Sequence, residues 1–224
     1  MARATDRLKS KKPPAIATKA EAAAELFLAG IEQAFNDPNE KRLVATVRRL
    51  GEAPRSLESA IDLYESRPDD SGFRWGVVYL ASKIGSPGTA EWLTRVALEE
   101  LPDPKHSEHG CEGPRDGEVL VRIMAAEGIG LLADSEGSEV ISDALTTIIT
   151  GQADPAVRSA AVVQLLRLDP AAAPRIRKIL PKQHKQFADV KLKTKPSEVD
   201  QRLGAPALDP GESPPPPQAG MTGA

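Results

Sequence analysis

Residues 154–168, DPAVRSAAVVQLLRL, carry the clearest structural signal in the sequence. Asp154 and Pro155 are typical of a helix start, because an aspartate accepts hydrogen bonds from the first amides and proline fits the first turn. Apolar residues then recur with the 3.6-residue period of an α-helix. They are Val157, Ala160, Ala161, Leu165 and Leu168. Arg158 directly follows the first of them, so the stretch predicts an amphipathic helix with a fixed arginine.

The same pattern occurs at two earlier places in the chain. Counting from the first apolar residue, it occupies positions 0, +3, +4, +7, +8 and +11 of each copy. The earlier copies are Phe73, Gly76, Val77, Leu80, Ala81 and Ile84, and then Val121, Met124, Ala125, Gly128, Ile129 and Leu132. Gln164 is the one position that is neither apolar nor glycine. Because Arg74, Arg122 and Arg158 all stand one residue after the start, the sequence predicts an internal repeat.

A second helix is predicted between successive copies. Residues 89–101 and 138–150 each follow a glycine and have helical apolar spacing. The repeating unit is therefore a helix, a turn and a helix. Arg122 and Arg158 are 36 residues apart, whereas Arg74 and Arg122 are 48 apart. A polar insertion at residues 102–116 accounts for the longer spacing.

The repeated motif resembles the HEAT-repeat family, in particular the short bacterial HEAT-like repeats of the phycobilin-lyase type. The resemblance rests on D-P-x-V-R-x-A-A at residues 154–161 and on V-R-x-x-A-A-x-x-I-G-x-L at residues 121–132, and it covers about residues 55–180. It implies that the repeated arginines tie neighbouring units together by hydrogen bonds. It says almost nothing about function, because such armadillo-like helical arrays serve as scaffolds, adaptors and a few enzymes.

The expected fold class is all-α, an α-solenoid of about four stacked antiparallel helix pairs with disordered termini. Residues 1–17 are expected to form a disordered basic arm, and residues 18–180 the HEAT-like helical repeat domain with its insertion at 102–116. Residues 181–224 are expected to form a tail that is first basic and then rich in Pro, Gly and Ala. Helices at residues 18–35 and 39–50 would form the first pair and cap the array.

The composition favours a cytoplasmic protein. A single cysteine fits a reducing compartment, and no apolar run has the length needed to cross a bilayer. Residues 21–174 hold 14 Lys/Arg and 26 Asp/Glu, a net charge of −12, whereas residues 1–20 and 175–195 are basic. An acidic body favours a neutral or basic protein partner and makes nucleic acid an unlikely one, although the basic ends leave nucleic-acid binding as an alternative.

No catalytic residue, cofactor or small-molecule substrate is predicted. His106, His109 and Cys111 have ligand chemistry for zinc, but no fourth ligand follows at a familiar spacing, so no metal site is predicted. Gly128, Gly130 and Ala133 match the letters of a dinucleotide-binding turn, yet they fall within a predicted helix. An enzyme of the lyase or DNA-glycosylase type on a HEAT-like scaffold is the remaining alternative.

The leading functional hypothesis is a non-catalytic scaffold or adaptor that binds another protein on its concave surface, lined by the second helix of each pair. Large or charged residues beside the buried stripe are the candidate contacts: Arg74, Trp75, Tyr79, Ile123, Glu127 and Val162. Trp, Tyr and Arg are the residues that most often dominate binding energy. The alternative for Trp75 and Tyr79 is packing against the preceding helix. Arg74, Arg122, Arg158 and Asp154 are the predicted structural residues of the repeat.

Overall fold

The computed structural model describes residues 15–36, 40–103 and 114–190. Within these ranges every regular element is helical and no strand occurs, which confirms the prediction of an all-α chain. His106, His109, Cys111 and most of the two predicted tails lie outside the described residues.

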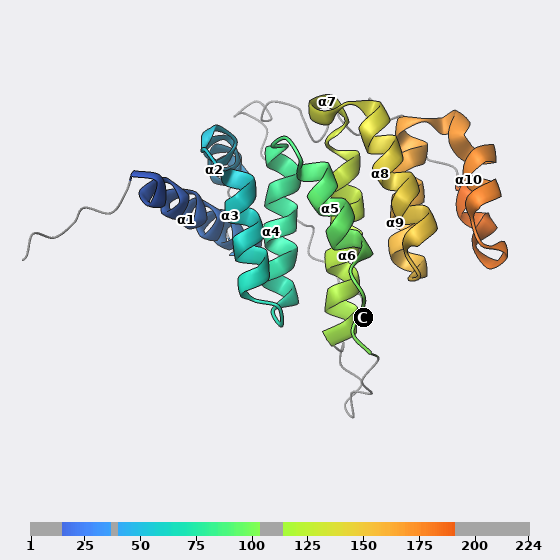
Figure 1. Cartoon of the computed structure of the whole chain (residues 1–224), viewed down its shortest axis with the longest axis horizontal. Helices are drawn as coiled ribbons and strands as arrows, with labels where there is room; N and C mark the ends of the chain where they lie inside the picture. Colours follow the sequence, from blue (N-terminus) through green and yellow to red (C-terminus); the bar gives the residue numbers. More distant parts are fainter. Residues whose placement is uncertain (1–14, 37–39, 104–113, 191–224) are drawn as a thin grey trace, which may run out of the picture. The chain divides into compact units, whose positions relative to one another are not determined.

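Most helices follow one another through connections of a few residues, whereas α5 and α6 are separated by residues 99–113 (Figure 1). They are α1 (Ala15–Asn36), α2 (Glu40–Glu52), α3 (Ser56–Ser66), α4 (Ser71–Ile84), α5 (Thr89–Leu98), α6 (Pro114–Gly130), α7 (Ala133–Glu136), α8 (Ser138–Gly151), α9 (Pro155–Leu168) and α10 (Ala173–Ile179), with 3₁₀ helices η1 (Pro170–Ala172) and η2 (Lys182–Asp189). The three copies of the sequence pattern form α4, α6 and α9.

Side-chain caps fix the starts of two of these helices. The Asp70 carboxylate accepts a hydrogen bond from the Phe73 amide at 2.9 Å, and the Asp154 carboxylate accepts one from the Ala156 amide at 2.9 Å. Such a cap stabilises a helix by about 1 kcal/mol. At the other end of α4, Gly85 adopts the left-handed conformation (φ 61°) that ends a helix without steric cost.

The helices between α3 and α9 pack as three pairs, α3 with α4, α5 with α6 and α8 with α9. Helices α4, α6 and α9 also contact one another in that order, and α5 contacts α8. Ser71 and Ser82 lie against Gly117 and Gly128 respectively, so α4 and α6 run in the same direction. The first helices of the pairs therefore form one layer and the second helices form another.

The predicted stripe forms the core between these layers. Fifteen of its 18 positions are buried, and the other three (Ile84, Ala160 and Leu168) are half-buried. Small residues let the second helices approach closely: a Cβ added to Gly128 would lie 2.6 Å from the Ser82 Cβ. Gln164, the polar exception, is buried as well, and its side chain packs against Gly130.

Three details differ from the sequence-based expectations. The helical region continues past residue 180, because η2 packs on α9 and α10 and buries Ala188. The insertion starts and ends earlier than the predicted 102–116, since α5 ends at Leu98 and α6 begins at Pro114. In α1, the spacing of Ala24, Phe27, Leu28, Ile31 and Phe35 predicts one inward face, but Phe27 and Ile31 are buried whereas Leu28 and Phe35 are exposed.

Candidate functional site

The repeated arginines share one kind of contact in all three pairs, although their other neighbours differ. Each is buried, and each donates hydrogen bonds to backbone carbonyls at the carboxyl end of the preceding helix, where amide partners are lacking. Arg122 bonds the carbonyls of Glu99 at 3.0 Å and Glu100 at 2.9 Å, just after α5. A cation is also favoured there by the helix dipole.

The other two arginines repeat this arrangement. Arg158 donates to the carbonyl of Ile149 at 3.0 Å and to that of Gln152, at the end of α8. Its remaining nitrogen lies 2.5 Å from the His184 ring, which connects α9 to η2. Arg74 reaches the carbonyl of Pro68, just after α3, at 3.5 Å. The arginines thus fasten the two helices of a pair to each other.

Two of the arginines share a buried ionic cluster that joins the α3–α4 pair to the α5–α6 pair. The Glu118 carboxylate accepts hydrogen bonds from Arg74 and from Arg122, each at 2.5 Å. The Glu99 carboxylate accepts from Arg74 at 2.7 Å and from the Tyr64 hydroxyl at 2.8 Å. Two guanidinium groups therefore balance two carboxylates. Burial and the adjacent Glu99 raise the pKa of Tyr64, so its phenol keeps the proton that it donates.

A carboxylate accompanies each arginine, and of the three only Asp154 was predicted from the sequence. Asp70, Glu118 and Asp154 each stand four residues before their arginine, which places them one turn away on the same helix. Asp70 and Asp154 cap their helices, whereas Glu118 pairs with two arginines because α6 begins earlier. The spacing was visible in the sequence as a second repeated signal.

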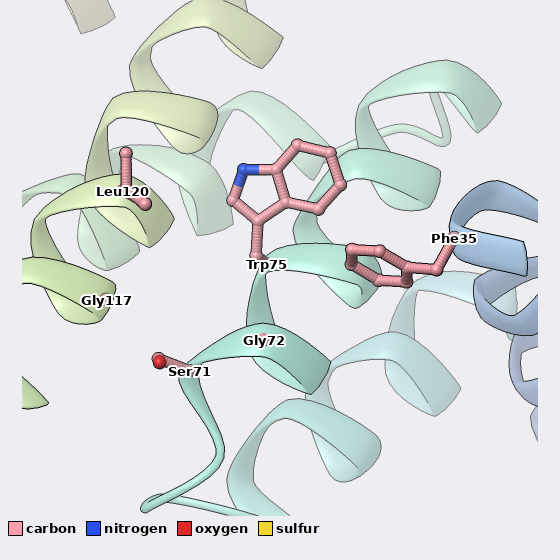
Figure 2. A pocket seen from close by; sticks show the side chains of 6 residues that line it. All are labelled: Phe35, Ser71, Gly72, Trp75, Gly117 and Leu120. Carbon is pink, nitrogen blue, oxygen red and sulfur yellow. The ribbon is translucent and has the colours of Figure 1, made fainter. Parts of the chain in front are cut away.

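An apolar groove lies along α4, with walls from α1 and α6 (Figure 2). The Trp75 indole forms its centre, between Phe35 of α1 and Leu120 of α6, and Ser71, Gly72 and Gly117 complete the lining. The volume is about 250 Å³. Phe35 is 53% exposed and Leu120 is 50% exposed, so large apolar surfaces face solvent at both walls. We call this feature the Trp75 groove.

Aromatic contacts fix the geometry of the Trp75 groove. The Trp75 ring stacks on Tyr79 with ring centres 5.3 Å apart, and the Phe35 ring is tilted against it at 5.4 Å. The Lys83 amine lies 5.5 Å from the centre of the Tyr79 ring. Burial lowers the pKa of Lys83. Gly76 allows α1 this close, because a Cβ there would stand 3.0 Å from the Ile31 side chain.

The six predicted contact residues are divided by the structure. Trp75 and Tyr79 lie half-buried beside the Trp75 groove, and Ile123 and Glu127 lie further along the same side of α6. Burial raises the pKa of Glu127, and Arg167 opposes that shift. Two residues need correction. Val162 is completely buried, and Arg74 belongs to the ionic cluster, so neither is available to a partner.

Of the residues that line the Trp75 groove only Trp75 was predicted, and the two large ones that were not are Phe35 and Leu120. Phe35 was assigned to the inner face of its helix, but the close approach of α4 at Gly76 leaves the end of α1 at the surface. Leu120 directly precedes the buried stripe of α6 and was not considered. As a large apolar residue outside the 3.6-residue pattern, it was the available sign of an exposed apolar surface.

A polar pocket of about 520 Å³ lies between the end of α5, the start of α6 and the α8–α9 connection. Glu100, Asp103, Arg115 and Asp154 are among its lining residues. In the described ranges, no group of three His, Cys, Asp or Glu side chains could hold a metal ion. Nor does any helix within those ranges combine the length and apolar character needed to span a bilayer.

Comparisons with known proteins found no relative of this chain: no protein-family model, no curated protein and no solved structure matches it.

Proposed function

We propose that this chain is a non-catalytic, HEAT-like α-solenoid scaffold that binds a protein partner on the exposed surface of its second helices. The observation that carries the proposal is the exposed apolar Trp75 groove, formed by α1, α4 and α6. The partner would place a large apolar side chain between Phe35 and Leu120.

The equivalent arginines support the scaffold part of the proposal. Arg74, Arg122 and Arg158 make the same type of bond to the end of the preceding helix, one in each pair. Equivalent bonds at equivalent sequence positions are expected when one supersecondary unit is repeated and each unit buries the surface of the next. The same-direction packing of α4 and α6 agrees with such a stack.

The composition of the Trp75 groove supports the binding part. Tryptophan and tyrosine dominate interface energetics, and exposed apolar patches commonly mark protein contacts. A cavity of about 150 Å³ lined by apolar side chains binds a benzene molecule, so a groove of about 250 Å³ is large enough for an aromatic or long aliphatic side chain. Because Trp75 is already stacked on Tyr79, it is held in place before any partner arrives.

The test compares bound proteins between variants that differ only at the groove. The full chain is immobilised, exposed to extract from its native host, and the retained proteins are identified by mass spectrometry. Leu120→Ser and Val140→Ser form a matched pair, because these helical residues are 50% and 52% exposed and only Leu120 lines the groove.

A partner of the groove is retained by the unaltered chain and by Val140→Ser but not by Leu120→Ser. With that partner purified, Trp75→Ala should weaken binding about thirtyfold, the loss typical of a dominant interface residue. Far-UV circular dichroism and the melting temperature establish that each variant is folded. Equal retention by both serine variants would overturn the proposal.

A further inference from the structure

The charged residues around the Trp75 groove point to the chemistry of its partner. Asp116 precedes the groove residue Gly117, and Asp70 precedes Ser71. Glu32 stands one turn before Phe35 on α1, and Glu127 stands two turns after Leu120 on α6. All four carboxylates belong to exposed residues. Acidic side chains therefore border the groove on three helices.

The basic side chains next to these carboxylates are already engaged. Arg67 lies 3.9 Å from Asp70, Arg167 interacts with Glu127, and the Lys83 amine is half-buried over the Tyr79 ring. Residues 21–174 as a whole carry a net charge of −12, so this surface attracts cations.

Glu127 provides a second indication. Burial raises its pKa even though Arg167 is close enough to oppose the shift. A carboxylate in that state is stabilised when another cation approaches, because the added charge favours its ionised form. A positively charged partner would supply that cation.

We propose that the Trp75 groove binds a basic peptide segment of another protein, with one bulky apolar side chain seated on Trp75 and lysine or arginine side chains against the surrounding carboxylates. The inference rests on the proposed function and adds the chemistry of the partner. The apolar anchor supplies most of the affinity, because it is desolvated between Phe35 and Leu120. The basic residues accelerate association and select against acidic segments.

The experiment uses short random peptides displayed on phage and selected on the full chain. Leu120→Glu and Trp75→Ala serve as counter-selection, and Leu120→Glu remains informative if Trp75→Ala is unstable, because Leu120 is a surface residue. Peptides that need the groove should share an aromatic or long aliphatic residue flanked by lysine or arginine.

The best selected peptide is then synthesised for titration. Asp116→Asn combined with Glu127→Gln should weaken its binding about tenfold at low salt, since each exposed pair contributes up to about 1 kcal/mol. The control neutralises two exposed carboxylates on α8, Glu139→Gln with Asp143→Asn, and should leave the affinity unchanged.

The outcomes separate the two proposals. Groove-dependent peptides that lack basic residues, or an unchanged affinity after neutralisation of Asp116 and Glu127, would overturn the basic-segment inference while the protein-binding function stands. If no selected peptide depends on Trp75 or Leu120, both fail together.

Discussion

The buried ionic cluster allows a direct comparison of two chemically identical ion pairs. Arg122 and Glu118 are four residues apart on α6, with side chains 2% and 7% exposed. Arg48 and Glu52 have the same spacing on α2, with side chains 82% and 67% exposed. The pairs differ in burial, in the order of the two residues along the helix and in the further bonds that Arg122 makes, so replacing each arginine with methionine compares a buried environment with an exposed one.

Arg122→Met should strongly destabilise the protein. It leaves the buried cluster with one guanidinium and two carboxylates, and it removes the donors to the carbonyls of Glu99 and Glu100. Breaking a buried pair on one side costs about 3–5 kcal/mol. Because Glu118 keeps its bond to Arg74, we expect the lower end, about 3 kcal/mol. Arg48→Met should cost less than about 0.5 kcal/mol.

Urea unfolding followed by circular dichroism measures both losses. With a denaturant dependence of about 1–3 kcal/mol per molar, Arg122→Met should lower the midpoint by about 1–3 M and Arg48→Met by a few tenths at most. The variant Arg122→Met/Glu118→Leu supplies the second arm. It leaves Arg74 with Glu99, again a neutral set, and should be more stable than Arg122→Met alone. Equal midpoints for the two single variants would refute the reasoning, and so would additive losses in the double variant.

Three further predictions concern packing and titration. Gly128→Ala should destabilise the fold by about 1–3 kcal/mol, because its Cβ would meet the Ser82 Cβ at 2.6 Å. Gly51→Ala should stabilise the fold by up to about 1 kcal/mol, because its Cβ would have only an Ile84 methyl group nearby, at 4.0 Å. Thermal melts of the two variants compare these effects. In Tyr79→Phe, Tyr64 is the only tyrosine, and its raised pKa predicts no phenolate absorbance at pH 11 while the helices persist. Since the folded state keeps that proton above pH 10, where the unfolded state loses it, stability should fall as the pH rises beyond 10. Lys83 should have the opposite effect on the pH dependence of stability. Its lowered pKa means that the unfolded state binds more protons just below pH 10.5, so the contribution of Lys83 to stability should increase with pH there. NMR titration of methylated lysines, with the Lys83 signal assigned from Lys83→Arg, should place its pKa below 10.5.

The periodic signals of the sequence were sufficient to predict the helices and their core. A stripe with 3.6-residue spacing requires an apolar partner, and three copies of it at related spacings provide one another with that partner. Asp154 with Pro155 fixes a helix start by local hydrogen bonding alone. These features depend on residues close together in the sequence, which is why one sequence is enough to find them.

Long-range features could not be read in the same way. The contact of Arg74 with Glu118 joins residues 44 positions apart, and no local pattern specifies which carboxylate an arginine meets. The exposure of Phe35 depends on where α4 crosses α1, which is set by Gly76 in a different helix. Val162 was assigned to the surface because it follows the stripe by one position, but α9 is covered by α6, α8 and η2 and keeps only a narrow exposed side.

Differences between the copies explain why the Trp75 groove forms at α4. The residue after each arginine is Trp75, Ile123 or Ser159, and the fifth residue after it is Tyr79, Glu127 or Val163. Only α4 has aromatic residues at both positions. Helix α6 begins eight residues before its arginine, whereas α4 and α9 begin three before theirs, and this added length supplies the wall at Gly117. The positions that line the Trp75 groove lie off the buried stripe, so their side chains can vary between the copies without disturbing the core that the arginines and the stripe maintain.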